Sequence, residues 1–159
     1  MIITYYFSLS SPYAYLGANR FLKIASTHNA KIKYKPTNME IVFPQTGGLP
    51  LAKRSSERKK YRITELMRWS KYLNIPLNLD PRYFPTSEWP AAGIIIYLQL
   101  KGLDPSPLLN KFFRAVWVEN RNIGDVNTIV EIINEVGLDG DILLKSSQNI
   151  NIKKKWKEN

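Results

Sequence analysis

The chain has 159 residues, 44% of them hydrophobic, and its 23 lysine and arginine residues against 13 acidic ones give a formal net charge of +10 at pH 7. That length is enough to bury one ordinary core. Because there is no cysteine and only one histidine, His28, the chain has no disulfide, no thiolate nucleophile of its own and no ordinary zinc site.

The start of the chain has no basic leader, and no apolar run approaches the roughly 20 residues that span a bilayer. We therefore expect a cytoplasmic protein without a membrane partner. The basic charge invites a nucleic-acid interpretation, but the densest patch, residues 53–62, fits the solvated face of a helix with Glu57 and Glu65 interleaved. We favour the solvated face and expect no nucleic-acid partner, although the same field would attract a small anion.

The first elements read as strand, helix, strand. Residues 2–9 are rich in β-branched and aromatic types, which favours a buried strand. A helix follows from Ser11, since Ser10 or Ser11 can cap it and Pro12 suits its first turn. Residues 31–38 predict a second strand, interrupted at Pro36.

Glycine and proline predict a loop over residues 43–50, after which helices dominate. The apolar spacing predicts a long helix and four shorter ones at residues 55–73, 89–100, 107–120, 126–136 and 141–147. We interpret Trp69 and Trp117 as core residues, and His28 as a surface residue at the end of the first helix.

The corner at Ser11 has a chemical meaning as well as a structural one. A helix N-terminus directs unpaired N–H groups and positive dipole toward an anion. Ser11 can simply cap the helix, or its hydroxyl can donate to a bound anion. If that anion is a thiolate, a thiol cofactor must bring the sulfur, because the chain has none; glutathione is the obvious candidate.

The sequence resembles 2-hydroxychromene-2-carboxylate isomerases, relatives of the kappa-class glutathione transferases. Four segments carry the resemblance in the family's order: SPYAYLG, KKYRITELMRWSKYLNIPLN, RYFP and RAVWVENRNIGD. It covers essentially the whole chain and implies an α/β fold, a thioredoxin-like β-α-β half with a large all-helical insertion. We accordingly expect residues 1–43 to belong to the thioredoxin-like domain and residues 44–159 to the insertion.

The resemblance also implies a chemistry and a set of site residues. Ser11 would stabilise the thiolate of glutathione, which adds reversibly to an unsaturated substrate and so permits cis-trans isomerisation. Lys53 and Tyr83 occupy the places that match the family's substrate contacts, with Arg54 adjacent, and these side chains suit a small aromatic carboxylate. Lys53 and Arg54 can instead decorate a helix start, and Tyr83 can pack in the core; departures at Ala52 and around Val42 leave the exact substrate open.

The resemblance implies further strands, which the end of this sequence lacks. No proline follows Pro107, and the last residues carry no hairpin signal or β-rich run. We therefore expect the C-terminal strands of the fold to be missing, as in a fragment of a longer enzyme, a polypeptide completed by another chain, or a decayed gene product. A completing chain or a homodimer are the possible partners. A kappa-like glutathione transferase and a non-catalytic interaction module that uses an open strand edge are the alternatives.

Overall fold

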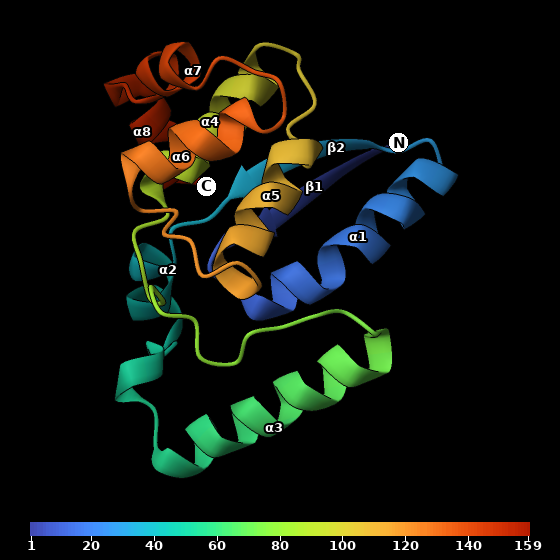
Figure 1. Ribbon diagram of the computed structural model, residues 1–159, viewed down its shortest axis with the longest axis vertical. Helices are drawn as coiled ribbons and strands as arrows, with labels where there is room; N and C mark the ends of the chain where they lie inside the picture. The colour runs from blue at the N-terminus through green and yellow to red at the C-terminus, as the bar shows by residue number, and fades with distance from the viewer.

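The computed structural model describes residues 1–159, and its centre is a small parallel sheet (Figure 1). Strands β1 (Ile2–Phe7) and β2 (Lys31–Pro36) pair in parallel, and helix α1 (Pro12–Thr27) makes the crossover. Tyr5 lies opposite Tyr34 in the register, and their rings meet edge to face. The predicted strand, helix, strand order is confirmed, although both strands end two residues earlier than the pattern indicated.

The two edges of this sheet have different neighbours. Helix α4 (Trp89–Leu100) runs along β2, and its Gln99 side chain accepts a hydrogen bond from the Tyr34 N–H and donates one to the Tyr34 carbonyl at 3.2 Å. The side-chain amide thus bonds to β2 as a neighbouring strand would. Strand β1 pairs only with β2, so its other edge has no strand beside it.

Helix α2 (Met39–Thr46) occupies part of the segment interpreted as a loop, so that interpretation is wrong for residues 43–46. The Asn38 side chain caps α2 by accepting from the Glu40 N–H. Pro44 lies near the end of this short helix, where its missing N–H removes only one helical hydrogen bond. Gly47 then ends the helix with a φ of 71°, a conformation that suits glycine.

A single 3-10 turn, η1 (Leu51–Lys53), leads into the long helix α3 (Ser56–Leu73), which the sequence predicted. Helix α3 lies apart from the helices at the opposite end of the molecule and contacts α1 (Figure 1). Only Leu66 of α3 is buried, whereas Trp69 is 42% exposed. The interpretation of Trp69 as a core residue is therefore wrong, because α3 packs mainly against α1 and buries only Leu66.

The other predicted helices are confirmed with small shifts in their ends: α5 (Ser106–Trp117), α6 (Val126–Asn134) and α7 (Gly140–Ser147), besides α4. Helix α8 (Ile150–Glu158) was not anticipated. The Asn149 side chain caps it, and Ile152 and Trp156, four residues apart, bury one face. None of the helices is both long and apolar enough to pass through a membrane.

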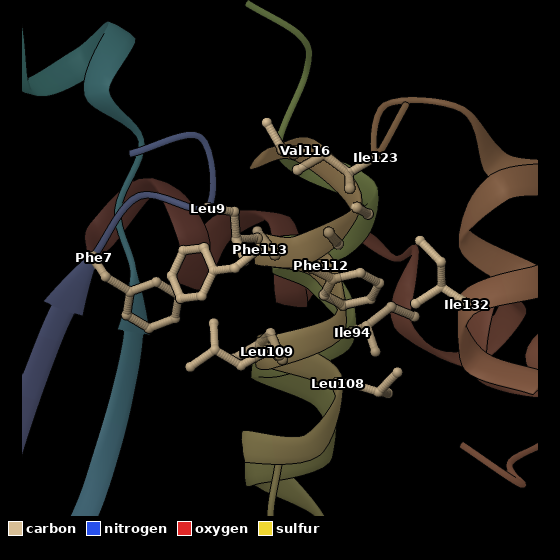
Figure 2. Close-up of a cluster of buried hydrophobic side chains, with 14 of the residues drawn as sticks. Phe7, Leu9, Ile94, Leu108, Leu109, Phe112, Phe113, Val116, Ile123 and Ile132 are labelled. Atoms are coloured by element: carbon tan, nitrogen blue, oxygen red, sulfur yellow. The ribbon is translucent and has the colours of Figure 1, made fainter. Parts of the chain in front are cut away.

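One hydrophobic core joins the sheet to the helices. Figure 2 shows Phe7 of β1 and Leu9 meeting Phe113 of α5, with Ile94 of α4 and Ile132 of α6 beyond them. Trp117 is fully buried, as predicted, and His28 is exposed at the end of α1. The division at residue 43 stays a prediction.

Candidate functional site

Ser11 sits where β1 gives way to α1. Its extended backbone precedes the helix, and its Oγ accepts a hydrogen bond from the Ala14 N–H at 3.2 Å, so the capping interpretation is correct. Pro12 follows as the first helical residue. Because Oγ is the acceptor in that bond, the hydroxyl proton stays free to be donated, and Ser11 is half-buried.

Glu88, which the sequence analysis did not single out, bonds to the turn that precedes Ser11. Its Oε1 accepts from the Ser8 hydroxyl at 2.6 Å, and its Oε2 accepts from the Leu9 N–H at 2.7 Å. Both bonds connect the turn before Ser11 to the residue that precedes α4, about 80 positions along the chain. From the sequence alone, the position of Glu88 just before a helix suggests that its side chain caps α4. The Glu88 side chain makes no such capping bond.

Burial raises the pKa of the Glu88 carboxyl group, and the hydrogen bonds from Ser8 and Leu9 oppose that rise. Ser10 acts on the same carboxyl group and also lowers its pKa, but the buried Ser10 hydroxyl has no hydrogen bond of good geometry. Ser10 and Ser11 are therefore not equivalent, because Ser10 is buried whereas Ser11 is half-buried. The chain thus offers one serine to a ligand at this corner.

An open cavity of about 360 Å³ lies between the first turn of α1 and the start of α3. Tyr13, Arg54, Glu57, Arg58, Tyr61 and Arg62 line it. Tyr13 is two residues beyond Ser11, so the cavity and the serine corner share the same turn of α1. The Arg54 guanidinium is oriented by donation from its Nε to the Leu49 carbonyl at 2.9 Å.

The predicted substrate residues divide between two places. Arg54 lines the cavity, whereas Lys53 ends the turn η1 with an exposed side chain and is not among the lining residues. Tyr83 is 39% exposed, and its ring lies 5.4 Å from the Arg82 guanidinium. The structure therefore brings Arg54, but not Lys53 or Tyr83, into this cavity.

Tyr13, Arg58 and Arg62 were missed as site residues. The four-residue spacing of Arg54, Arg58 and Arg62 was visible in the sequence, but it was interpreted as part of a solvated helix face. That face is solvated, and it is also the wall of the cavity. The spacing of the arginines alone does not predict that α1 lies opposite them across the cavity.

The parallel β-α-β unit, with a helix N-terminus at its corner and helices after it, agrees with the thioredoxin-like half that the resemblance implies. A family profile described as DSBA-like thioredoxin domain matches residues 2–159, and the chain belongs to that family. The family resemblance and the α/β fold class expected from the sequence are thereby confirmed. The expectation of missing strands stays a prediction.

Two characterised relatives match over most of the chain. A 2-hydroxychromene-2-carboxylate isomerase from Pseudomonas putida is 28% identical over 120 residues, which are 75% of this chain and 57% of the relative. A glutathione S-transferase kappa 1 from Caenorhabditis elegans is 26% identical over 145 residues, 86% of this chain and 62% of the relative. The chain thus spans about three fifths of the length of these relatives.

Solved structures agree in fold. A 2-hydroxychromene-2-carboxylate isomerase superposes with a TM-score of 0.73 at 21% identity, covering 98% of this chain and 75% of that one. The cytosolic disulfide reductase DsbM from Pseudomonas aeruginosa, solved with GSH, gives a TM-score of 0.69 at 14% identity and covers 98% of this chain and 76% of its own. At these identities the likeness concerns the fold alone.

Proposed function

We propose that this chain acts in a glutathione-dependent cis-trans isomerase of the 2-hydroxychromene-2-carboxylate type. The observation that supports it best is the half-buried Ser11, whose hydroxyl keeps a free proton, at the N-terminus of α1 in a chain without cysteine. The names of the relatives, an isomerase and a kappa-class transferase, point in the same direction.

The residues at the corner suit an anionic sulfur. The Ser11 hydroxyl donates to it while its oxygen still accepts from the Ala14 N–H, and the N-terminal dipole of α1 adds positive potential. Both effects favour the ionised form of a thiol whose ordinary pKa is about 8.5. Bound glutathione would supply the nucleophilic sulfur whose reversible addition lets a substrate double bond rotate.

The substrate would be held by polar residues near this corner. Arg54 is placed to meet a carboxylate in the cavity beside α1. Lys53 and Tyr83 lie outside this cavity, and their roles as a second cation and as a phenol from the loop before α4 rest on the resemblance alone. Ser11 is a hydrogen-bond donor in this proposal and forms no bond to the substrate.

A titration of glutathione with the whole chain tests the role of Ser11. We expect the chain to shift thiolate formation, followed by its ultraviolet absorbance, to lower pH, and the Ser11→Ala variant to move the midpoint back up by about one pH unit. Ser26→Ala, at an exposed serine near the other end of α1, is the matched control and should change nothing. An unshifted thiol, or equal midpoints for Ser11→Ala and the unaltered chain, would refute the proposal.

A kappa-like glutathione transferase is the close alternative, supported by the similarity to the Caenorhabditis elegans relative. It would use the same Ser11 but transfer the sulfur to an electrophile instead of releasing it. Incubation with glutathione and either a cis-configured aromatic enoate or an aryl halide separates the two. Isomerised product with glutathione recovered unchanged favours the isomerase; a stable thioether favours the transferase.

A non-catalytic interaction module is the third candidate. The observation in its favour is the open edge of β1, where Ile2 is 71% and Tyr6 57% exposed. A completing chain or a second copy could add a strand there by main-chain hydrogen bonds. A chain that leaves the glutathione thiol unperturbed yet sediments as a dimer or complex would favour this candidate.

A further inference from the structure

A stripe of four residues runs along one face of α3. Tyr61, Glu65, Arg68 and Tyr72 follow one another at spacings of four, three and four residues, which places them within about 60° of one another around the helix. Leu66, the buried residue of α3, lies on a different side of the helix. The tyrosines at the two ends are exposed, Tyr61 by 64% and Tyr72 by 78%. We call this set the α3 stripe.

The α3 stripe lies beside a further exposed aromatic ring. Trp69 is also exposed, and its ring meets that of Tyr72 edge to face with the centroids 5.8 Å apart. Single apolar residues on a surface are ordinary, but aromatic residues gathered on one helix face are typical of a contact surface. Because α3 packs mainly against α1 at one end of the molecule, the chain itself leaves this face uncovered (Figure 1).

The order of residues in the α3 stripe is the same in both directions: tyrosine, charge, charge, tyrosine. Two copies of α3 that lie antiparallel about the midpoint of the stripe therefore bring Tyr61 against Tyr72 of the partner subunit. The same arrangement brings Glu65 against Arg68 of the partner subunit, and a two-fold axis repeats both contacts. A parallel arrangement would instead oppose each charge to its own copy, which is repulsive. The pattern thus fits a second copy of this chain in one orientation.

The charges of the α3 stripe have the capacity for contacts in both chains. Within one chain, Arg68 Nη1 donates to Glu65 Oε1 at 3.1 Å, and the Arg68 side chain is still 72% exposed. A guanidinium has five N–H donors, and a carboxylate has about four acceptor sites. Each group can therefore bond to its counterpart in the other chain without releasing its own, and the four charges then alternate in sign across the axis.

We infer that the α3 stripe is a contact surface between two copies of this chain, joined antiparallel through its tyrosines and its charge pair. One helix face buries less area than a standard interface, and the net charge of +10 on each copy opposes association. The dimer should therefore be weak, with a dissociation constant in the micromolar range. The inference does not rest on the proposed function, because no ligand takes part in the contact.

The position of the α3 stripe connects the second copy to the candidate site. Tyr61 belongs both to the stripe and to the lining of the cavity between α1 and α3. In the dimer, Tyr72 of the partner subunit lies against Tyr61 at the rim of that cavity. Each cavity therefore gains part of its wall from the other chain.

Sedimentation velocity of the whole chain without glutathione, from about 1 to about 300 µM, tests the contact. We expect a monomer–dimer equilibrium within this range. Arg68→Glu, Glu65→Arg and Tyr72→Ala should each weaken the dimer at least about tenfold. Lys60→Glu is the matched control, since Lys60 is exposed on the same helix, lies outside the stripe and takes part in no ion pair. It changes the net charge as Arg68→Glu does and should dimerise like the unaltered chain.

A mixture of two variants separates contacts between chains from contacts within one chain. Glu65→Arg and Arg68→Glu each lose the charge attraction, both along the helix and across the axis. In a mixture, the two arginines of one chain face the two glutamates of the other. A heterodimer should therefore form although neither variant dimerises alone. A charge pair that only stabilised its own helix would give no such recovery.

Three results would overturn the inference. The first is an unaltered chain that stays monomeric over the whole range. The second is a set of α3 variants that dimerise as well as the unaltered chain, which would assign the dimer to another surface, such as the edge of β1. The third is a mixture that stays monomeric while both variants are folded by circular dichroism. Should either charge variant be unfolded, Tyr72→Ala, at an exposed residue and without a change of charge, decides alone.

Discussion

Ser10 and Ser11 are neighbours in the chain with opposite surroundings. Ser10 is 9% exposed, and its hydroxyl lacks a hydrogen bond of good geometry. Ser11 caps α1 and is half-exposed. The reason is that the turn after β1 directs one serine inward toward Glu88 and leaves the next to begin the helix. The Ser10 hydroxyl thus lowers the stability of the fold, whereas the Ser11 hydroxyl contributes to it.

Alanine substitutions should separate the two serines. Ser11→Ala removes the cap from α1 and should lower the free energy of unfolding by about 1 kcal/mol. Ser10→Ala removes a buried hydroxyl without a good partner, so it should leave stability unchanged or raise it slightly. Urea unfolding of both variants measures the difference. A Ser10→Ala loss as large as that of Ser11→Ala would mean that Ser10 is hydrogen-bonded after all.

The buried carboxyl group of Glu88 leads to a prediction about how the stability of the fold depends on pH. Its pKa is raised in the folded chain, so folding favours its protonated form, and the contribution is fully present at low pH and lost as pH rises through the folded pKa. Glu88→Gln removes this titration. The stability of the unaltered chain relative to Glu88→Gln should therefore fall as the pH rises above about 4.3, the ordinary pKa of glutamate.

Urea unfolding across that pH range measures this effect. Asp80→Asn, at an exposed carboxyl group without an ion pair, is the matched control and should run parallel to the unaltered chain. If the Glu88→Gln curve also runs parallel to that of the unaltered chain, the environment assigned to Glu88 is wrong.

Among the secondary-structure elements, α4 has an unusual role because one of its side chains bonds to the edge of β2 in place of a neighbouring strand. Its Gln99 side chain satisfies both backbone groups of the buried residue Tyr34 on β2. A two-stranded sheet is marginal by itself, and this bond network connects it to the helical part of the chain. The edge of β2 is therefore protected by one amide, while the edge of β1 stays open.

Gln99→Leu should destabilise the chain by about 1 to 3 kcal/mol, because it leaves the buried N–H and C=O of Tyr34 without partners. The amide of Tyr34 should exchange with solvent hydrogen faster, which a merely local change in α4 would not cause. Gln45→Leu, at an exposed glutamine of α2, is the control. Unchanged exchange at Tyr34 in Gln99→Leu would contradict the role given to Gln99.

Across the whole molecule, stability comes from one core that crosses from the sheet to the helices. Phe7 and Phe113 meet with ring centroids 6.2 Å apart, and Phe113 also faces Tyr15 of α1. Helix α3 contributes little to this core, since Leu66 is its one buried residue. Aromatic residues of similar size therefore differ greatly in importance according to the helix that carries them.

Phe113→Ala should cost about 3 to 5 kcal/mol, since it opens a cavity where β1, α1 and α5 meet. Trp69→Ala, on the exposed face of α3, should cost less than about 1 kcal/mol although it removes a larger side chain. Thermal and urea unfolding of the two variants make the comparison. A similar loss for both would show that α3 is held by more than its contact with α1.

Local patterns in the sequence were enough for most of the fold. The Ser11 cap with Pro12, and the apolar run of α4, follow from short-range preferences that act within one or two turns. The prediction of a loop over residues 43–50 failed where local preferences competed. Pro44 disfavours a helix, but the Asn38 cap and the glycine after Thr46 favour one, and α2 forms. The family resemblance rested on spacing as well, and it too was confirmed.

The candidate site depends on contacts that no local pattern contains. Glu88 reaches Ser8 across 80 positions, and Gln99 reaches Tyr34 across 65. Arg54, Arg58 and Arg62 had a readable spacing, but whether that face meets solvent or a second helix depends on where α1 lies. The sequence by itself determined the helix start and its serine; only the tertiary structure decided which distant carboxylate, amide and tyrosine surround them, because packing brings together groups that the chain holds far apart.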